Sequence, residues 1–85
     1  MAQYEIRVLP SVLEDLRRVD KSDVRRILDR IESLAQNPRP DDCRKLTGRD
    51  LYRVRSGVYR ILYEMHDDAV VVVVVKVGHR REVYR

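Results

Sequence analysis

The chain of 85 residues has no tryptophan and no phenylalanine, and it has only one cysteine, three glycines and three prolines. Valine, leucine, isoleucine and tyrosine must therefore fill its hydrophobic core. The single thiol, Cys43, excludes an internal disulfide, as is usual for proteins of a reducing compartment. Because Cys43 lies in a polar segment with no candidate base beside it, we expect a thiol without a catalytic role.

The sequence also lacks a targeting or membrane-spanning segment. Its start, MAQYEIRVLP, carries charges where a signal peptide needs an apolar stretch. The valine run at residues 70–75 is far shorter than the about 20 apolar residues that span a bilayer. We therefore expect a cytoplasmic protein.

Motifs for metal or nucleotide chemistry are missing as well. No glycine-rich phosphate loop precedes a helix, and no cysteines and histidines have the spacing of a zinc site. The run His66-Asp67-Asp68 offers metal ligands, but three consecutive residues of this kind are far more often a turn. We expect neither a metal nor another cofactor.

Charge is what the sequence has in abundance. Charged residues make up 38% of the chain, the net charge is +4 and the sequence pI is about 9.6. A hydrophobic fraction of 44% without low-complexity runs predicts one folded domain over residues 1–85. The excess positive charge favours a polyanionic partner, which leaves nucleic acid, an anionic membrane surface and an acidic protein open.

The first half of the chain predicts a strand and two helices. The stretch QYEIRVL alternates apolar and charged residues, which is typical of a half-buried strand. Ser11 with Glu14 three residues later indicates a capping box that starts the first helix, before the stripe Val12, Leu13, Leu16 and Val19. A second helical stripe follows, formed by Val24, Ile27, Leu28, Ile31, Leu34 and Ala35.

The second half predicts a loop over residues 39–50 and then three strands, LYRVR, VYRILYEMH and AVVVVVVKV. Ser56-Gly57 and Asp67-Asp68 separate the strands and are expected to form hairpin turns. The predicted fold is α+β, with the helical hairpin on one face of a mostly antiparallel sheet. The valine run is expected to be a central strand, because a strand buried on both faces loses its alternation.

Arginines are concentrated in the first of these hairpins. Strand alternation places Arg53 and Arg55 on one face, and a Ser56-Gly57 turn would set Arg53 opposite Arg60. Like charges directly opposite one another destabilise a strand pair. Two interpretations remain open: a solvated face whose side chains splay apart, or an anion-binding site.

The C-terminal segment GHRREVYR follows the valine strand, and the Asp67-Asp68 turn would set Arg60 opposite Val75, near its start. The arginines could thus converge with this segment, since guanidinium groups bind phosphate and tyrosine stacks on unpaired bases. His79 is the obvious proton shuttle of this cluster, and a surface histidine at a strand end is the simpler alternative. The candidate residues are Arg53, Arg55, Arg60, His79, Arg80, Arg81, Tyr84 and Arg85.

The motifs RKLTGRDLYRVRSGVYRILYE and KVGHRREVY, in this order, resemble the RelE/ParE superfamily of bacterial and archaeal toxins. The resemblance covers nearly the whole chain and implies the same α+β fold. Its RelE-like members are ribosome-dependent endoribonucleases that cut mRNA in the ribosomal A site without a metal. In that reaction the ribose 2′-OH attacks the adjacent phosphate.

The resemblance also implies roles for individual residues. It places Arg60 and Arg80 at the scissile phosphate, Tyr84 against the nucleotide, and Arg53 and Arg55 at the family's basic pair. Arg81 and Arg85 would be solvated charges that contact RNA. The family typically has lysine at the basic pair, and because guanidinium is a poor general base, His79, a water or ribosomal RNA would have to take part in proton transfer.

Two other functions remain open at this point. A ParE-like toxin of the same fold would inhibit DNA gyrase by binding it, and a non-catalytic module would bind RNA without cutting it. The intact GHRREVY segment favours the ribonuclease, because the ParE branch generally lacks it. The partners implied are an acidic or amphipathic RelB-like antitoxin, the ribosome and mRNA, with no membrane partner.

Overall fold

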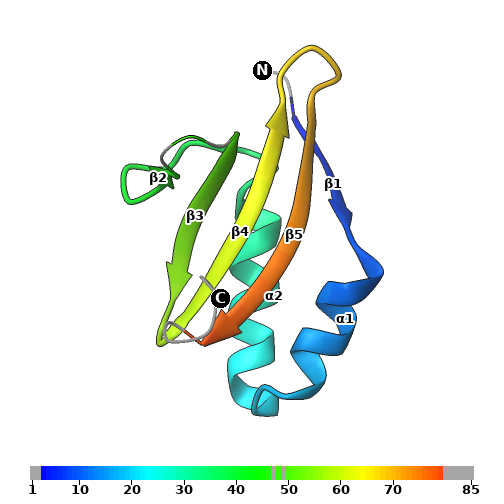
Figure 1. Cartoon of the computed structure of the whole chain (residues 1–85), viewed down its shortest axis with the longest axis vertical. Helices are drawn as coiled ribbons and strands as arrows, with labels where there is room; N and C mark the ends of the chain where they lie inside the picture. The colour runs from blue at the N-terminus through cyan, green and yellow to red at the C-terminus, as the bar shows by residue number, and fades with distance from the viewer. Residues whose placement is uncertain (1–2, 47, 49, 80–85) are drawn as a thin grey trace.

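A computed structural model describes residues 3–46, 48 and 50–79 of the chain. Its elements are, in order, β1 (Glu5–Val8), α1 (Pro10–Arg17), α2 (Lys21–Ser33), β2 (Arg44–Lys45), β3 (Leu51–Ser56), β4 (Tyr59–His66) and β5 (Val71–His79). The sheet has the strand order β1-β5-β4-β3-β2, and the two helices lie together against one side of it (Figure 1). The predicted α+β fold is thereby confirmed.

β1 pairs with β5 in parallel, and all other neighbouring strands are antiparallel. The chain can return in parallel because the α1–α2 hairpin and the β3–β4 hairpin lie between the two strands in sequence. The core lies between the helices and the sheet, where the most deeply buried side chains are Val12, Ile27, Leu34, Val54, Ile61, Tyr63, Val72, Val74 and Val77. Within the described part of the chain, neither helix is long and apolar enough to cross a membrane.

The valine run forms most of β5, an interior strand between β1 and β4, as predicted. Val72 and Val74 face the helices and are fully buried. A register shift between Leu62 and Tyr63 of β4 leaves Val75 without a direct partner, and Val77 then returns to the core. This bulge changes the alternation along the nine-residue strand, so that Val72 and Val74 before it and Val77 after it all face the core.

Beyond Val74, the edge of β5 is covered by α1 and no longer by β1. The pairing of β1 with β5 ends at Val8 and Val74. Beyond it, a carboxylate oxygen of Asp15 accepts a hydrogen bond from the backbone N–H of Val77, at 3.2 Å. Asp15 therefore satisfies a strand donor that β1 does not reach.

The predicted start of the first helix was wrong. α1 begins at Pro10 with Leu9 as its N-cap, and no side chain caps it. Proline at the first helical position replaces the capping box, because its φ is already helical and its missing N–H is not needed there. The predicted apolar stripes also included two residues that are not buried, because Leu13 and Leu28 are 58% and 45% exposed.

The predicted turns were each displaced. β3 and β4 are joined by Gly57 and Val58, with Gly57 at φ 60°, so that Arg55 lies opposite Arg60 and Arg53 opposite Leu62. A positive φ at the first of two turn residues is the requirement of a type II′ turn, which suits glycine.

The second connection, between β4 and β5, spans residues 67–70 and ends at Val70, a β-branched residue with φ 57°. Together with the bulge this longer turn sets Arg60 opposite Gly78, and not opposite Val75 as expected. The expected loop over residues 39–50 contains the short strand β2.

Asp67, in the turn between β4 and β5, ties three segments together. Its carboxylate accepts a hydrogen bond from the Tyr4 hydroxyl at 2.8 Å and pairs with the Arg39 guanidinium at 2.8 Å. Arg39 also lies over the Tyr52 ring, 5.7 Å from its centroid. The hydrogen bonds from Arg39 and Tyr4 hold the pKa of Asp67 below its usual value.

The Asp67 cluster predicts a pH-dependent stability. Because the folded-state pKa of Asp67 is depressed, its contribution is present above the unfolded-state pKa, about 3.9, and is lost as the pH falls through the folded-state value. Asp67→Asn should lower the melting temperature at pH 7, and the difference from wild type should shrink steadily below pH 4. Asp68→Asn is the matched control, since Asp68 bonds to neither Tyr4 nor Arg39. A difference that stays constant down to pH 2 would contradict the assignment.

Candidate functional site

The face of the sheet that carries no helix holds the arginines. Val54 points into the core, so its neighbours Arg53 and Arg55 point to the opposite side of β3. Strand pairing extends this arrangement to β2 and β4: Arg44 lies opposite Arg53, and Arg60 opposite Arg55. We call these four residues, Arg44, Arg53, Arg55 and Arg60, the arginine face.

Register orders the open face in two rows that run across the strands. One row contains Arg44, Arg53, Leu62 and Lys76, and the other contains Arg55, Arg60 and Gly78. Directly opposite residues have Cβ atoms about 4.5–5.5 Å apart. The arginines of each row therefore lie close enough to hold a single anionic group between them.

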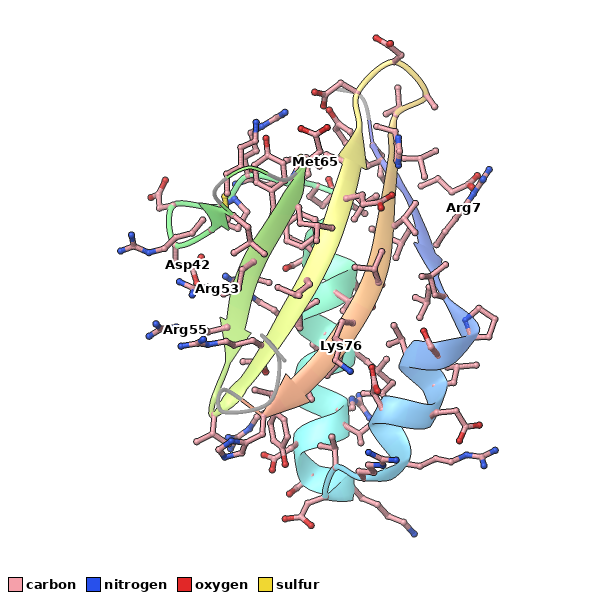
Figure 2. The ribbon with its side chains drawn as sticks, viewed as in Figure 1. Arg7, Asp42, Arg53, Arg55, Met65 and Lys76 are labelled. Atoms are coloured by element: carbon pink, nitrogen blue, oxygen red, sulfur yellow. The ribbon has the colours of Figure 1, made fainter. Side chains whose placement is uncertain are left out.

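A groove of about 430 Å³ runs beside this face, bordered by Arg44, Arg53 and Arg55 together with residues 41–43. Figure 2 shows Arg53 and Arg55 extending from β3 toward this side, with Asp42 beside them. Asp42 is paired with Arg30 of α2, whose guanidinium contacts both carboxylate oxygens. The Asp42 charge is thus already compensated, and the groove keeps a positive character.

Apolar surface is also present on the open face. Leu62 is only 6% exposed although it points away from the helices, and its cross-strand neighbours are Arg53 and Lys76. The buried leucine provides an apolar surface against which the aliphatic parts of the two cationic side chains can pack. Phosphate and base could both be accommodated on such a surface.

The structure brings together some of the predicted site residues. Arg53, Arg55 and Arg60 share the open face, as expected, although the pair directly opposite one another is Arg55–Arg60. Arg80, Arg81, Tyr84 and Arg85 lie outside the described residues. Arg44 was missed by the sequence reasoning, which read its segment as a loop.

His79 does not join the arginine face. It lies opposite Tyr59, and the two rings meet edge to face with centroids 6.0 Å apart. Tyr59 alternates with Arg60 and packs against the core cluster, so this ring pair lies on the helix side. His79 also borders a cavity of about 320 Å³ that is lined by Asp15 of α1, by Arg18 directly after α1 and by Lys76. The bulge in β5 separates it from the arginines, which a simple alternation count could not reveal.

The chain is similar to known toxin proteins over nearly its whole length. The profile of the family described as "ParE toxin of type II toxin-antitoxin system, parDE" matches residues 6–84. The protein RelE1 of Methanocaldococcus jannaschii is 30% identical over 98% of this chain and 97% of its own length.

Solved structures of toxins are similar as well. The archaeal RelE–RelB complex from Pyrococcus horikoshii contains a chain with a TM-score of 0.83 and 30% identity, covering 98% of this chain and 100% of that one. The intact E. coli RelBE toxin–antitoxin complex contains one with a TM-score of 0.75 and 28% identity, covering 89% and 95%.

The facing pair Arg55–Arg60 predicts that removing one of its charges will stabilise the fold and weaken anion binding. Arg55→Gln should raise the free energy of unfolding by about 0.2–1 kcal/mol at low salt, because it removes a like-charge pair. The same change should weaken binding to single-stranded poly(U) and reduce the slope of log K against log salt by about 0.7, the value for one phosphate contact. Arg25→Gln on α2 removes the same charge from the other side and is the control. An unchanged salt slope in Arg55→Gln would argue against an anion site.

Proposed function

Because the chain belongs to the RelE/ParE superfamily of type II toxins, we propose that it is a ribosome-dependent endoribonuclease that cuts mRNA in the ribosomal A site. The observation that carries this proposal is the arginine face, where Arg55 and Arg60 lie directly opposite each other. Such a pair is costly for folding and suits a doubly charged phosphate.

The proposed reaction is a transfer within the RNA chain. The ribose 2′-oxygen loses its proton and bonds to the adjacent phosphorus, the bond to O5′ breaks, and O5′ gains a proton. The products are a 2′,3′-cyclic phosphate and a 5′-OH end. Negative charge accumulates on the phosphorane oxygens in the transition state, and preorganised guanidinium groups stabilise it.

The roles divide along the two cross-strand rows. Arg55 and Arg60 would hold the scissile phosphate, with Arg80 joining them from the C-terminal segment. Arg53 and Arg44 would contact a neighbouring phosphate in the groove, two residues along β3 and therefore about 7 Å away. Tyr84 would stack on the nucleotide, and Arg81 and Arg85 would add charge along the RNA.

Proton transfer needs a further group. Arginine keeps its proton under ordinary conditions, so the arginine face can bind charge but cannot exchange a proton. His79 was the expected shuttle, but its ring contacts Tyr59 on the helix side. We therefore place His79 outside the reacting centre in this proposal.

A ParE-like gyrase inhibitor is the second candidate, since the profile that matches residues 6–84 is that of ParE toxins. This function would require binding alone. Gyrase binding gives no physical reason for paired arginines on an open sheet face. A module that only binds RNA is a further alternative, and it would need no group that exchanges a proton.

Primer extension on a translated mRNA after induction distinguishes these candidates. Wild type should produce cuts within codons, and Arg60→Ala should reduce the single-turnover cleavage rate by about 10²–10³, the usual effect of losing one transition-state donor. Arg26→Ala on the exposed side of α2 should cleave like wild type. Intact mRNA together with gyrase-dependent DNA damage would instead support the ParE-like function.

We also propose an antitoxin partner of opposite charge. The related toxins of P. horikoshii and E. coli were solved in complex with RelB or as RelBE. A chain with net charge +4 suits an acidic segment laid over its arginine face.

The acidic product of a neighbouring gene should therefore copurify with this chain, and its affinity should fall with rising salt. Arg53→Glu should weaken the complex at least about tenfold because it reverses the sign of one charge that would face the acidic segment. Arg25→Glu, on α2, should leave it nearly unchanged. Equal losses from the two variants would contradict binding at the arginine face.

A further inference from the structure

A second positively charged surface lies on the α1 side of the sheet. The pairing of β1 with β5 ends at Val74, and beyond it a cavity of about 320 Å³ opens between the end of α1 and the last residues of β5. This volume is at the lower end of the range for small-molecule sites, about 300–1,000 Å³, and suits a group of the size of one nucleotide. We call it the α1 cavity, after its lining residues Asp15, Arg18, Tyr59, Lys76 and His79.

The charges around the α1 cavity do not cancel. Asp15 is the one acid among the described residues that line it, and both carboxylate oxygens have partners, the Lys76 Nζ at 3.7 Å and the Val77 N–H at 3.2 Å. Arg18 is exposed and has no ion-pair partner among the described residues. The larger cavity near Asp67 differs, because three of its lining residues are acids. The α1 cavity therefore favours an anion.

Aromatic and apolar side chains form another part of the cavity wall. The rings of Tyr59 and His79 meet edge to face, with centroids 6.0 Å apart, and Val19 lies beside them. An aromatic ring offers a stacking surface to any unpaired base, and a guanidinium binds a phosphate through two parallel hydrogen bonds. The combination suits a nucleotide of an RNA chain better than an acidic side chain, which would use the charge alone.

The α1 cavity and the arginine face lie on different sides of the molecule. Figure 2 shows Lys76 directed from β5 toward α1, and Arg53 and Arg55 extending from β3 at the opposite edge of the sheet. β4 separates these two strands, so they are two strand spacings apart, or about 10 Å. Tyr59 packs against the core cluster on the helix side, away from the open face. The chain can thus contact two RNA segments at once.

We propose that the α1 cavity binds a nucleotide of ribosomal RNA, an inference that rests on the proposed ribosome-dependent function. Arg18 contacts the phosphate, and Tyr59 and His79 lie against the base. The arginine face by itself binds RNA through charge, which does not distinguish free mRNA from mRNA on a ribosome. Two contacts on one particle reinforce each other, because the first holds the second at a high local concentration. The ribosome is preferred because it offers both RNAs.

The test measures single-turnover mRNA cleavage against the concentration of programmed ribosomes. Arg18→Gln should raise the ribosome concentration for half-maximal rate by about tenfold to a hundredfold, the usual effect of losing a hydrogen bond to a charged group. The rate at saturating ribosomes should not change, because the arginine face is intact. Arg17→Gln is the matched control and should behave as wild type, since Arg17 is the neighbouring residue, carries the same charge and pairs with Glu14 at 3.5 Å.

Chemical probing of the ribosomal RNA gives a second measurement that does not depend on cleavage. An mRNA with a 2′-deoxynucleotide at the scissile linkage lacks the attacking hydroxyl and keeps the complex intact. The wild-type and Arg17→Gln chains should protect a ribosomal RNA nucleotide that Arg18→Gln leaves unprotected. Because Arg18 is exposed, Arg18→Gln should unfold at the wild-type temperature.

Three results would overturn the inference. An unchanged ribosome dependence of Arg18→Gln would mean that the α1 cavity holds no RNA. Equal losses of affinity for ribosomes and for free poly(U) would assign the cavity to mRNA. Weaker antitoxin binding with a normal ribosome dependence would assign it to the antitoxin.

Failure of the proposed function itself would look different. A wild-type chain that cuts no mRNA at any ribosome concentration would refute the ribonuclease. The probing experiment would still decide whether Arg18 binds ribosomal RNA, because it measures protection and not cleavage.

Discussion

The register of β4 between β3 and β5 is the constraint on which the rest of the molecule depends. Ile61 and Tyr63 are fully buried against the helices, and their partners Val54, Val74 and Val77 are buried with them. A slip of one residue would move every one of these side chains to the open face. The apolar core thus fixes where each alternate residue must point, including those that carry charge.

Arg55 and Arg60 face each other as a consequence of this packing. The core dictates their side of the sheet, and the two-residue turn at Gly57 and Val58 dictates their alignment. Like charges placed directly opposite one another cost stability. An energetic cost of this kind is typical of sites that bind an anion.

A carboxylate fixes each end of the sheet to a neighbouring segment. At one end, Asp67 joins Tyr4 and Arg39 and closes the turn between β4 and β5. At the other end, Asp15 of α1 supports the β5 edge after β1 has ended, and pairs with Lys76 of β5. The same carboxylate thus accepts a backbone hydrogen bond at the strand edge and compensates the charge of a lysine.

The sequence by itself determined the fold class, the central valine strand and the side of the sheet on which Arg53, Arg55 and Arg60 lie. These follow from local periodicity, which the chain obeys because each element must bury one face. Only the tertiary structure decided the partners: Arg55 opposite Arg60, Arg44 beside Arg53, and His79 on the helix side. Those depend on one bulge, one turn position and a two-residue strand, and each is set by contacts between segments distant in the chain, which local patterns do not encode.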